Sequence, residues 1–299
     1  MALKRVRQFA EMIKFEHTVF ALPFAYLGAF LAKGGLPSAN QLLWITLAMV
    51  GARTAAMALN RLIDRHIDAR NPRTANRALP KGLISQYEVW FYVVGSWALL
   101  LLSAWQLNPQ NLTIPLTVRL MPIAVFVLTA YSYTKRFTWA CHLVLGLSLG
   151  LAPVGSWVGI TGQVQLPSIL LGLAVLTWVA GFDIIYACQD FKFDKNEGLN
   201  SIPVQFGIKI SLTVSSILHI LTVLFLIWTG MVVDLGYIYW LGLLVVAGIL
   251  IYEHRLVSPD DLSKLDAAFF NMNGILSVLV FIFTFADLIF GEGIPRQVR

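Results

Sequence analysis

The sequence predicts an all-α membrane protein, a bundle of nine transmembrane helices with a cytoplasmic N-terminus and a C-terminus outside. The 299 residues are 58% hydrophobic and 13% charged, and their mean hydropathy is +0.72. This is too apolar for a soluble globular domain. Apolar stretches of about 17 to 25 residues recur, which is the length that crosses roughly 30 Å of hydrocarbon as helix. We therefore expect residues 1–299 to form a single integral-membrane domain.

The first element is a basic leader at residues 1–17, in which Lys and Arg alternate with apolar side chains. We expect it to lie against the membrane surface. The apolar stretches that follow are separated by polar loops, and the longest loop covers residues 60–87. The nine predicted spans cover residues 18–33, 41–59, 88–107, 116–133, 141–158, 166–188, 210–230, 233–252 and 267–290.

The basic residues support this count, because cytoplasmic loops of membrane proteins hold an excess of Lys and Arg. With the N-terminus inside, 17 of the 22 Lys and Arg fall in inner segments. Only Lys33, Arg296 and Arg299 fall outside, and Arg53 and Arg119 lie within spans. We expect a multi-pass protein of the cell inner membrane. The net charge of +6 then reflects topology, and we expect no nucleic-acid partner.

Oxygen-bearing side chains recur every four residues where the second predicted span ends. Asn60, Asp64 and Asp68 share one face of a helix, because each four-residue step advances the chain by about 400°. An isolated set of this kind often only pairs with basic neighbours, here Arg61 and Arg65, on a solvated helix end.

A second acidic segment lies far along the chain. Asp190 and Asp194 repeat the four-residue step, and Asp183 comes seven residues earlier, so we expect all three on one helical face. Asp183 also falls inside an apolar span, where a charged side chain is costly and indicates function. Both acidic segments are predicted at the cytoplasmic side. This favours one shared site over two solvated helix ends.

These side chains indicate a site for a hard cation and a phosphorylated lipid. Carboxylate and amide oxygens suit Mg²⁺, and a few protein ligands leave coordination positions for a diphosphate. No cluster of His or Cys competes for a softer metal. The basic residues Arg73, Lys81, Lys135 and Arg136 follow the same spans and are candidates to contact phosphate oxygens. We expect the head of the substrate at the membrane edge and its tail in the bilayer.

Arg53 lies inside the second span, seven residues before Asn60 and therefore on the same face. It is either a counter-ion to an acidic neighbour or a binder of a substrate anion. The segment from Tyr131 to Arg136 adds hydroxyls and cations at the same membrane edge.

At these residues the chain resembles the UbiA superfamily of membrane aromatic prenyltransferases. The two aspartate-rich segments match the two signatures of the superfamily, and residues 131–136 resemble its cytoplasmic element. Residues 15–24 and 53–61 resemble the 4-hydroxybenzoate polyprenyltransferase-like subgroup. Arg61 departs from the pattern of many members, so the first segment has one carboxylate fewer. The number of bound metal ions is therefore open.

The resemblance implies roles for particular residues. The Mg²⁺ ligands are Asn60, Asp64, Asp68, Asp190 and Asp194. The catalytic candidates are Asp64, Asp183 and Asp190, with Asp183 orienting the acceptor or accepting its proton. The diphosphate contacts are Arg73 and Lys135. The acceptor contacts are Arg53, Tyr131 and Arg136.

The activity implied is transfer of a polyprenyl group from polyprenyl diphosphate to a ring carbon of a 4-hydroxybenzoate-type aromatic acid, in ubiquinone or menaquinone biosynthesis. An alternative acceptor is 1,4-dihydroxy-6-naphthoate, which leads to menaquinone. An alternative of another class is a divalent-cation transporter, which also places carboxylates within spans. Transport sites usually lie near the bilayer midplane, whereas the acidic residues gather here at one end of the predicted spans.

Overall fold

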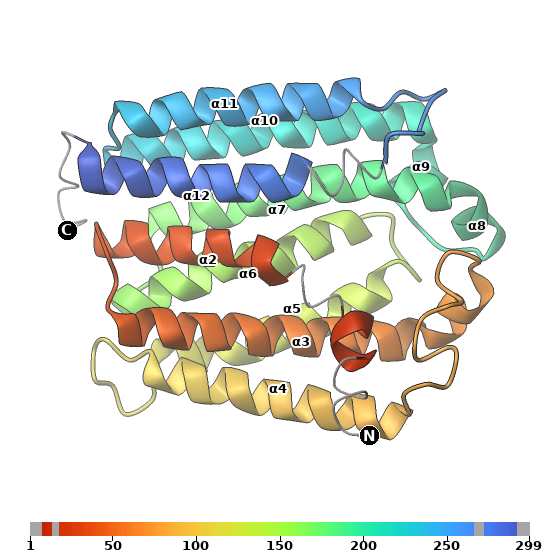
Figure 1. Ribbon diagram of the computed structural model, residues 1–299, viewed down its shortest axis with the longest axis horizontal. Helices are drawn as coiled ribbons and strands as arrows, with labels where there is room; N and C mark the ends of the chain where they lie inside the picture. Colours follow the sequence, from red (N-terminus) through yellow and green to blue (C-terminus); the bar gives the residue numbers. More distant parts are fainter. Residues whose placement is uncertain (1–7, 14–17, 266–271, 292–299) are drawn as a thin grey trace.

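Long helices lying side by side make up the protein (Figure 1). The structure, a computed structural model, describes residues 8–13, 18–265 and 272–291. Within these ranges the chain forms helices and loops and no β-strand. The helices are α2 (Thr18–Lys33), α3 (Ala39–Arg70), α4 (Gln86–Gln106), α5 (Leu116–Thr134), α6 (Cys141–Thr161), α7 (Leu166–Ala187), the 3₁₀ turn η2 (Cys188–Asp190), α8 (Phe191–Asn196), α9 (Ile202–Phe206), α10 (Ile208–Val233), α11 (Tyr237–Arg255) and α12 (Asn273–Phe290).

Eight helices of the described part are long and apolar enough to cross a membrane: α3, α4, α5, α6, α7 with its continuation, α10, α11 and α12. They correspond to eight of the nine predicted spans. The remaining span corresponds to α2, which is apolar but has 16 residues, fewer than the roughly 20 that a perpendicular crossing needs. The count of nine and the orientation of the termini stay predictions.

Helix α3 runs well past the predicted end of the second span at residue 59. A capping box on Ser38 begins it, and it continues for 32 residues, or about 48 Å. It stops where Pro72 follows Asn71, whose backbone is extended (φ −83°, ψ 119°), as expected for a residue before proline. The helix therefore continues beyond the predicted span through Asn60, Asp64 and Asp68, as their four-residue spacing predicts.

Helix α7 ends at Ala187, and η2 and α8 follow without a long loop. The predicted single helical face through Asp183, Asp190 and Asp194 is therefore wrong, because the 3₁₀ turn at Cys188–Asp190 shifts the register. The three aspartates nevertheless line one cavity.

Helices α6 and α7 approach each other closely through small residues. A Cβ atom on Gly146 would lie 2.2 Å from the backbone oxygen of Leu176, and one on Gly150 would lie 2.5 Å from that of Gly172. Small residues of this kind let the backbones of membrane helices pack tightly. This contact fixes the start of α6 against the end of α7.

The described part of the predicted leader packs on the bundle. Phe9 and Met12 are buried in a cluster with α3 and α4 residues such as Leu62 and Val93, and the Phe9 ring stacks on Tyr92. The expectation of a helix lying on the membrane surface does not hold for these residues. The rest of the leader, residues 1–7 and 14–17, lies outside the described part, as do Arg296 and Arg299.

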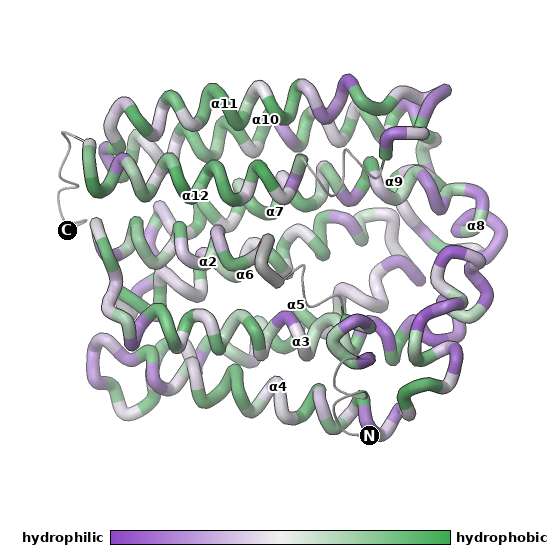
Figure 2. The backbone as a smooth tube through the Cα atoms, viewed as in Figure 1, coloured by the Kyte–Doolittle hydropathy of each residue, from purple (hydrophilic) through white to green (hydrophobic). Residues whose placement is uncertain are grey.

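Hydrophilic residues gather at one end of the bundle. Figure 2 shows them around α8, α9 and the loop between α3 and α4. Large apolar side chains are exposed along the outer helices, for example Phe126 on α5 and Leu244 on α11, each 71% exposed. Such a surface suits lipid rather than water.

Candidate active site

A cavity of about 750 Å³ opens between α3, α5, α6 and α7. Its mouth lies at the hydrophilic end and is lined by the aspartates of both acidic segments together with Arg73 and Lys135. Its depth is lined by apolar residues of α3, α5 and α6, including Met49, Leu128 and Leu149. The cavity therefore offers a charged mouth and an apolar interior.

Asp64 lies at the centre of the first acidic segment and is buried. Its Oδ2 accepts hydrogen bonds from Lys135 Nζ at 2.6 Å and from Asn60 Nδ2 at 3.1 Å. Its Oδ1 accepts from Arg136 Nη2 at 2.8 Å. The Asn60 amide also donates to Ser132 Oγ at 3.2 Å. These bonds hold the end of α3 against the end of α5.

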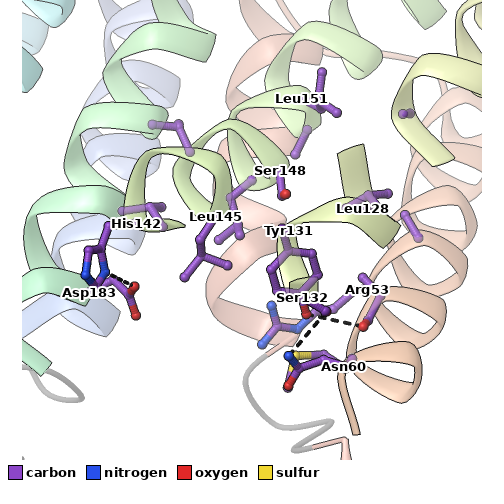
Figure 3. Close-up of a pocket in the computed structure, with 18 of the residues that line it drawn as sticks. Arg53, Asn60, Leu128, Tyr131, Ser132, His142, Leu145, Ser148, Leu151 and Asp183 are labelled. Carbon is purple, nitrogen blue, oxygen red and sulfur yellow. Dashed lines mark hydrogen bonds and ion pairs between the residues drawn. The ribbon is translucent and has the colours of Figure 1, made fainter. Parts of the chain in front are cut away.

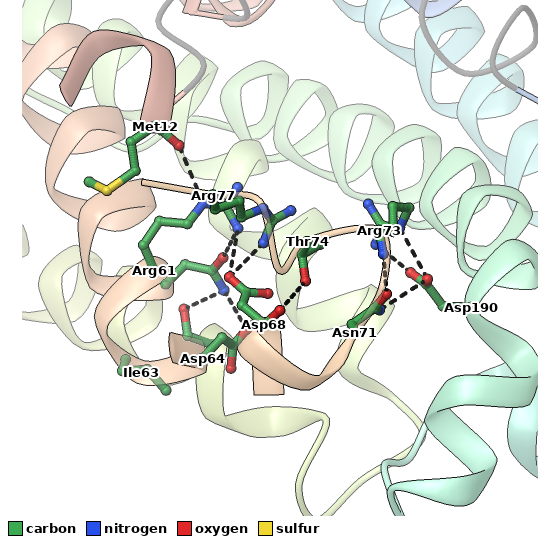
Figure 4. Close-up of polar contacts among 12 residues, drawn as sticks. Met12, Arg61, Ile63, Asp64, Asp68, Asn71, Arg73, Thr74, Arg77 and Asp190 are labelled. Atoms are coloured by element: carbon green, nitrogen blue, oxygen red, sulfur yellow. Dashed lines mark hydrogen bonds and ion pairs between the residues drawn. The ribbon is translucent and has the colours of Figure 1, made fainter. Parts of the chain in front are cut away.

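Asp68 lies one turn further along α3 and pairs with two arginines (Figure 4). Its Oδ2 accepts from Arg77 Nη1 at 2.7 Å and lies 3.9 Å from Arg61 Nη1. The Thr74 hydroxyl donates to the Asp68 carbonyl at 2.9 Å. The loop after α3 thus folds back over the acidic face.

Asp190 in η2 is held by the same loop. Arg73 donates to its two carboxylate oxygens through Nε, at 3.1 Å, and Nη2, and Asn71 Nδ2 donates to Oδ1 at 3.4 Å. Burial by itself would lower the pKa of the Arg73 guanidinium, but its hydrogen bond and charge interaction with Asp190 raise that pKa above the usual value. Asp194 lines the cavity, and its carboxylate makes no hydrogen bond or ion pair with any residue that the structure describes.

These bonds bring the two acidic segments together, as the sequence predicts. Residues 71 and 73 follow the first segment directly and contact Asp190 of the second. Both segments line the same cavity at the same end of the bundle.

A second layer of polar groups lies deeper in the cavity, roughly 10 Å from the mouth along each helix. On α3, Arg53 comes two turns before Asn60, and its buried Nε has no hydrogen-bond partner among the described residues. The Tyr131 hydroxyl donates to the Ala56 carbonyl at 3.2 Å. Figure 3 shows Arg53 and Tyr131 beside each other on the wall of the cavity.

On the opposite wall of this layer, Asp183 pairs with His142 of α6. His142 Nδ1 lies 2.7 Å from Asp183 Oδ2, and the histidine is buried. The sequence gives no indication of this pair. No spacing rule could link two residues 41 positions apart.

Ten of the twelve candidate site residues suggested by the sequence line the cavity, whereas Lys81 and Arg136 do not. The ten are Arg53, Asn60, Asp64, Asp68, Arg73, Tyr131, Lys135, Asp183, Asp190 and Asp194. Arg136 does not line it, because its guanidinium binds Asp64 and the carbonyls of Ser132 and Ile63. Sequence reasoning did not assign Asn71, Arg77 or His142 to the site.

The donor atoms at the mouth fit a hard divalent cation in type. They are carboxylate and amide oxygens, which Mg²⁺ prefers. In the described part of the chain no three His, Cys, Asp or Glu side chains lie close enough together to hold a metal by themselves. Water and substrate oxygens would have to complete the coordination, as is usual for Mg²⁺ at phosphate sites.

A model of the UbiA prenyltransferase family matches residues 21–275 of the chain. The chain belongs to the UbiA prenyltransferase family. It is 28% identical over 285 residues, 94% of this chain and 96% of the relative, to a 4-hydroxybenzoate octaprenyltransferase of Photobacterium profundum. It is 31% identical over 261 residues, 87% of this chain and 88% of the relative, to a 4-hydroxybenzoate octaprenyltransferase of Aliivibrio fischeri.

Solved structures of the UbiA family agree with this fold. The apo structure of a UbiA homologue from Aeropyrum pernix K1 is 32% identical, covers 91% of this chain and 98% of its own, and superposes with a TM-score of 0.81. A UbiA homologue from Archaeoglobus fulgidus, bound to DMAPP and Mg²⁺, shares the fold at 22% identity, with 95% and 99% coverage and a TM-score of 0.69. This UbiA-family chain is thus a multi-pass membrane prenyltransferase.

Proposed function

We propose that this protein transfers a polyprenyl group from polyprenyl diphosphate to a ring carbon of 4-hydroxybenzoate, in the synthesis of ubiquinone. The observation that carries the proposal is the meeting of two acidic segments and their cationic partners at the mouth of one otherwise apolar cavity. The relatives named 4-hydroxybenzoate octaprenyltransferase, which match most of the chain, support both the donor class and the acceptor.

The mouth of the cavity is the proposed diphosphate site. Its oxygen donors suit Mg²⁺, and the Archaeoglobus fulgidus homologue bound to DMAPP and Mg²⁺ supports this assignment. Bound there, Mg²⁺ would neutralise the charge that develops on the leaving diphosphate. The residues that would hold it are Asn60, Asp64, Asp68, Asp190 and Asp194.

Arg73 and Lys135 are the proposed direct contacts to the diphosphate. Each lines the cavity and pairs with an aspartate, Arg73 with Asp190 and Lys135 with Asp64. If those aspartates held a divalent cation, Arg73 and Lys135 would be available to bind the phosphate oxygens. Arg73 presents a fork of N–H donors that matches a phosphate group. The geometry favours Arg136 as a residue that holds Asp64, in place of the expected acceptor contact.

The apolar interior is the proposed site of the prenyl tail. Departure of the diphosphate leaves an allylic cation next to the deeper layer, away from bulk water, which would otherwise trap it. The aromatic acceptor attacks this cation through a ring carbon activated by its hydroxyl group.

The deeper layer is the proposed acceptor site. The unpartnered Nε of Arg53 suits the carboxylate of an aromatic acid, because buried guanidinium groups require an acceptor. Tyr131 lies beside it and would pack on the ring. Asp183, on the opposite wall, is the proposed acceptor of the ring proton.

We also propose that residues 1–299 are one integral-membrane domain in the cell inner membrane, with the mouth of the cavity toward the cytoplasm. The excess of Lys and Arg at the hydrophilic end supports this orientation. A divalent-cation transporter is disfavoured, because the carboxylates lie at the ends of α3 and α7 and not near the middle of the bundle.

The test is a reconstitution. Purified protein is incubated with Mg²⁺, octaprenyl diphosphate and, in parallel, 4-hydroxybenzoate or 1,4-dihydroxy-6-naphthoate, and the lipid extract is analysed by mass spectrometry. We expect prenylated 4-hydroxybenzoate and free pyrophosphate. Product from the naphthoate alone would overturn the acceptor assignment. Mg²⁺ flux into liposomes without any prenyl product would overturn the enzyme assignment.

A further inference from the structure

His142 and Asp183 form a hydrogen-bonded pair on the wall of the cavity (Figure 3). The two groups belong to different helices, α6 and α7, and their bonded atoms are 2.7 Å apart. The histidine side chain is 4% exposed, whereas the aspartate side chain is 24% exposed. Both residues line the cavity, and the aspartate is the more exposed of the two.

A second hydrogen bond identifies the nitrogen that carries the imidazole proton. The backbone N–H of Ile202 donates to His142 Nε2 at 3.4 Å. A backbone N–H can only donate, so Nε2 must present its lone pair. The ring proton then lies on Nδ1, which donates to Asp183 Oδ2. His142 thus donates to Asp183 and is held from its other side by the start of α9.

The partner of Asp183 differs in kind from the partners of the aspartates at the mouth. Asp64, Asp68 and Asp190 are each bonded to a Lys or Arg side chain. The partner of Asp183 is instead an imidazole ring that is itself held by the backbone N–H of Ile202. Asp183 Oδ1 makes no hydrogen bond with the residues described by the structure. One oxygen is thus fixed and the other is free toward the cavity.

We infer that His142 is a positioning residue for proton removal in the transfer reaction: its Nδ1–H fixes Asp183 so that the free carboxylate oxygen faces the ring carbon that has been prenylated. In that step the C–H bond of the ring carbon breaks, its electron pair restores the aromatic ring, and the proton passes to Asp183 Oδ1. The inference rests on the proposed function, and it concerns only the step after the carbon–carbon bond has formed.

The packing of α6 on α7 supports a positioning role. Gly146 lies one turn after His142, and its close approach to the α7 backbone fixes the distance between the two helices at the pair. The second bond of His142, to Ile202, prevents the ring from turning away from Asp183.

The test compares two variants of this histidine. His142→Phe keeps a ring of similar size and removes both hydrogen bonds. His142→Asn places an amide N–H where Nδ1 was and keeps the donor to Asp183. The readouts are kcat, the KM for octaprenyl diphosphate, and the kinetic isotope effect with 4-hydroxybenzoate deuterated at the ring carbon that is prenylated.

We expect His142→Phe to lower kcat about 100-fold, the lower end of the usual contribution of proton transfer, with the donor KM within about twofold of wild type. The isotope effect on kcat should become primary, because proton removal now limits the rate. His142→Asn should recover at least a tenth of the wild-type kcat and lose that isotope effect. His66→Leu, at an exposed histidine on α3 outside the cavity, should leave all three quantities unchanged.

The inference is overturned if His142→Phe keeps kcat within about threefold and shows no isotope effect, or if the Asn variant is as impaired as the Phe variant. If the Phe variant does not accumulate in membranes, Asp183→Asn decides: it should lose turnover while retaining Mg²⁺-dependent binding of octaprenyl diphosphate, and turnover near wild type refutes the role. Failure of the proposed function would be distinguishable from failure of this inference, because the wild-type protein would then form no prenylated 4-hydroxybenzoate.

Discussion

Aspartates bonded to cations are the main feature of the site at the scale of single residues. Asp64 accepts hydrogen bonds from Lys135 and Arg136, and Asp190 accepts two from Arg73, through Nε and Nη2. A buried carboxylate without such partners would be strongly unfavourable in an apolar bundle. The same charges that stabilise the fold therefore assemble the groups needed to bind a metal–diphosphate complex.

The first prediction concerns the charge of these aspartates. Asp64→Asn or Asp190→Asn removes a proposed metal ligand while keeping the side-chain volume, and we expect prenyl transfer to fall at least 100-fold, the scale of a lost electrostatic contact at a transition state. Activity is measured as prenylated product in membranes with matched protein amounts. Asp261→Asn, in the exposed loop after α11, is the control and should be fully active. More than a tenth of wild-type activity in either test variant would refute their role.

The second prediction concerns the shape of Arg73. Arg73→Lys keeps the positive charge but cannot bind two oxygens of one group at once. We expect the KM for polyprenyl diphosphate to rise about tenfold, equal to roughly 1.4 kcal/mol, with a smaller change in kcat. Arg70→Lys is the matched control, because Arg70 pairs with Glu197 outside the cavity. If Arg73→Lys and Arg70→Lys changed the KM for polyprenyl diphosphate equally, only the charge of Arg73 would matter and not its shape.

Sequence reasoning found the residues of the mouth because their spacing is local. Asn60, Asp64 and Asp68 are related by helical geometry that any sequence displays. His142 and Arg77 carry no such signal, since their roles come from contacts with Asp183 and Asp68 made by folding.

At the scale of elements, the contact between α6 and α7 sets the geometry of the deeper layer. His142 stands at the start of α6 and Asp183 near the end of α7, so the distance between the helices determines whether the pair forms. Gly146 and Gly150 remove the side chains that would keep the backbones apart.

The third prediction tests this contact. In Gly146→Ala, the new Cβ would lie 2.2 Å from the Leu176 backbone oxygen, so the helices must separate. Overpacking of this kind costs about 1–3 kcal/mol, and we expect a lower thermal midpoint of the purified protein together with reduced turnover. Gly248→Ala on α11, where no atom lies within 4 Å of the added Cβ, should keep both. An unchanged midpoint in Gly146→Ala would contradict the packing argument.

Hydropathy predicted that the long helices exist, but not the residues at which they end or give way to a 3₁₀ turn. The end of α3 at Arg70 depends on Asn71 and Pro72, beyond the apolar stretch. The 3₁₀ turn after Ala187 contains no proline or glycine, so the sequence gives no signal for it. Such boundaries depend on tertiary contacts, here the bonds from Asn71 and Arg73 to Asp190.

At the scale of the whole molecule, the bundle separates a hydrophilic end from an apolar body (Figure 2). The loop after α3 and the segments around α8 and α9 lie at the same end as the mouth of the cavity. The convergence of the two acidic segments at one end could be predicted, because both follow predicted spans that end on the same side of the membrane. The cavity of about 750 Å³ could not, because residues of several helices create it jointly.

The fourth prediction concerns orientation in the membrane. In a variant whose two native cysteines are replaced by serine, a cysteine is introduced at Asn76, in the exposed loop after α3, or at Gln110, in the exposed loop after α4. If the mouth faces the cytoplasm, a membrane-impermeant thiol reagent labels Asn76→Cys in inverted vesicles and Gln110→Cys in intact spheroplasts. The reversed pattern would refute the cytoplasmic orientation.

The ion pairs at the mouth have a consequence for turnover. Three aspartates are shared among five cations, which are Arg61, Arg73, Arg77, Lys135 and Arg136. A divalent cation held by these carboxylates would compete with the five basic side chains, and a diphosphate bound with it would give those side chains a new partner. Loading should therefore be cooperative between ion and donor. Without bound diphosphate, the arginines and the lysine pair with the aspartates, as they do in this structure, so these ion pairs would re-form after each turnover.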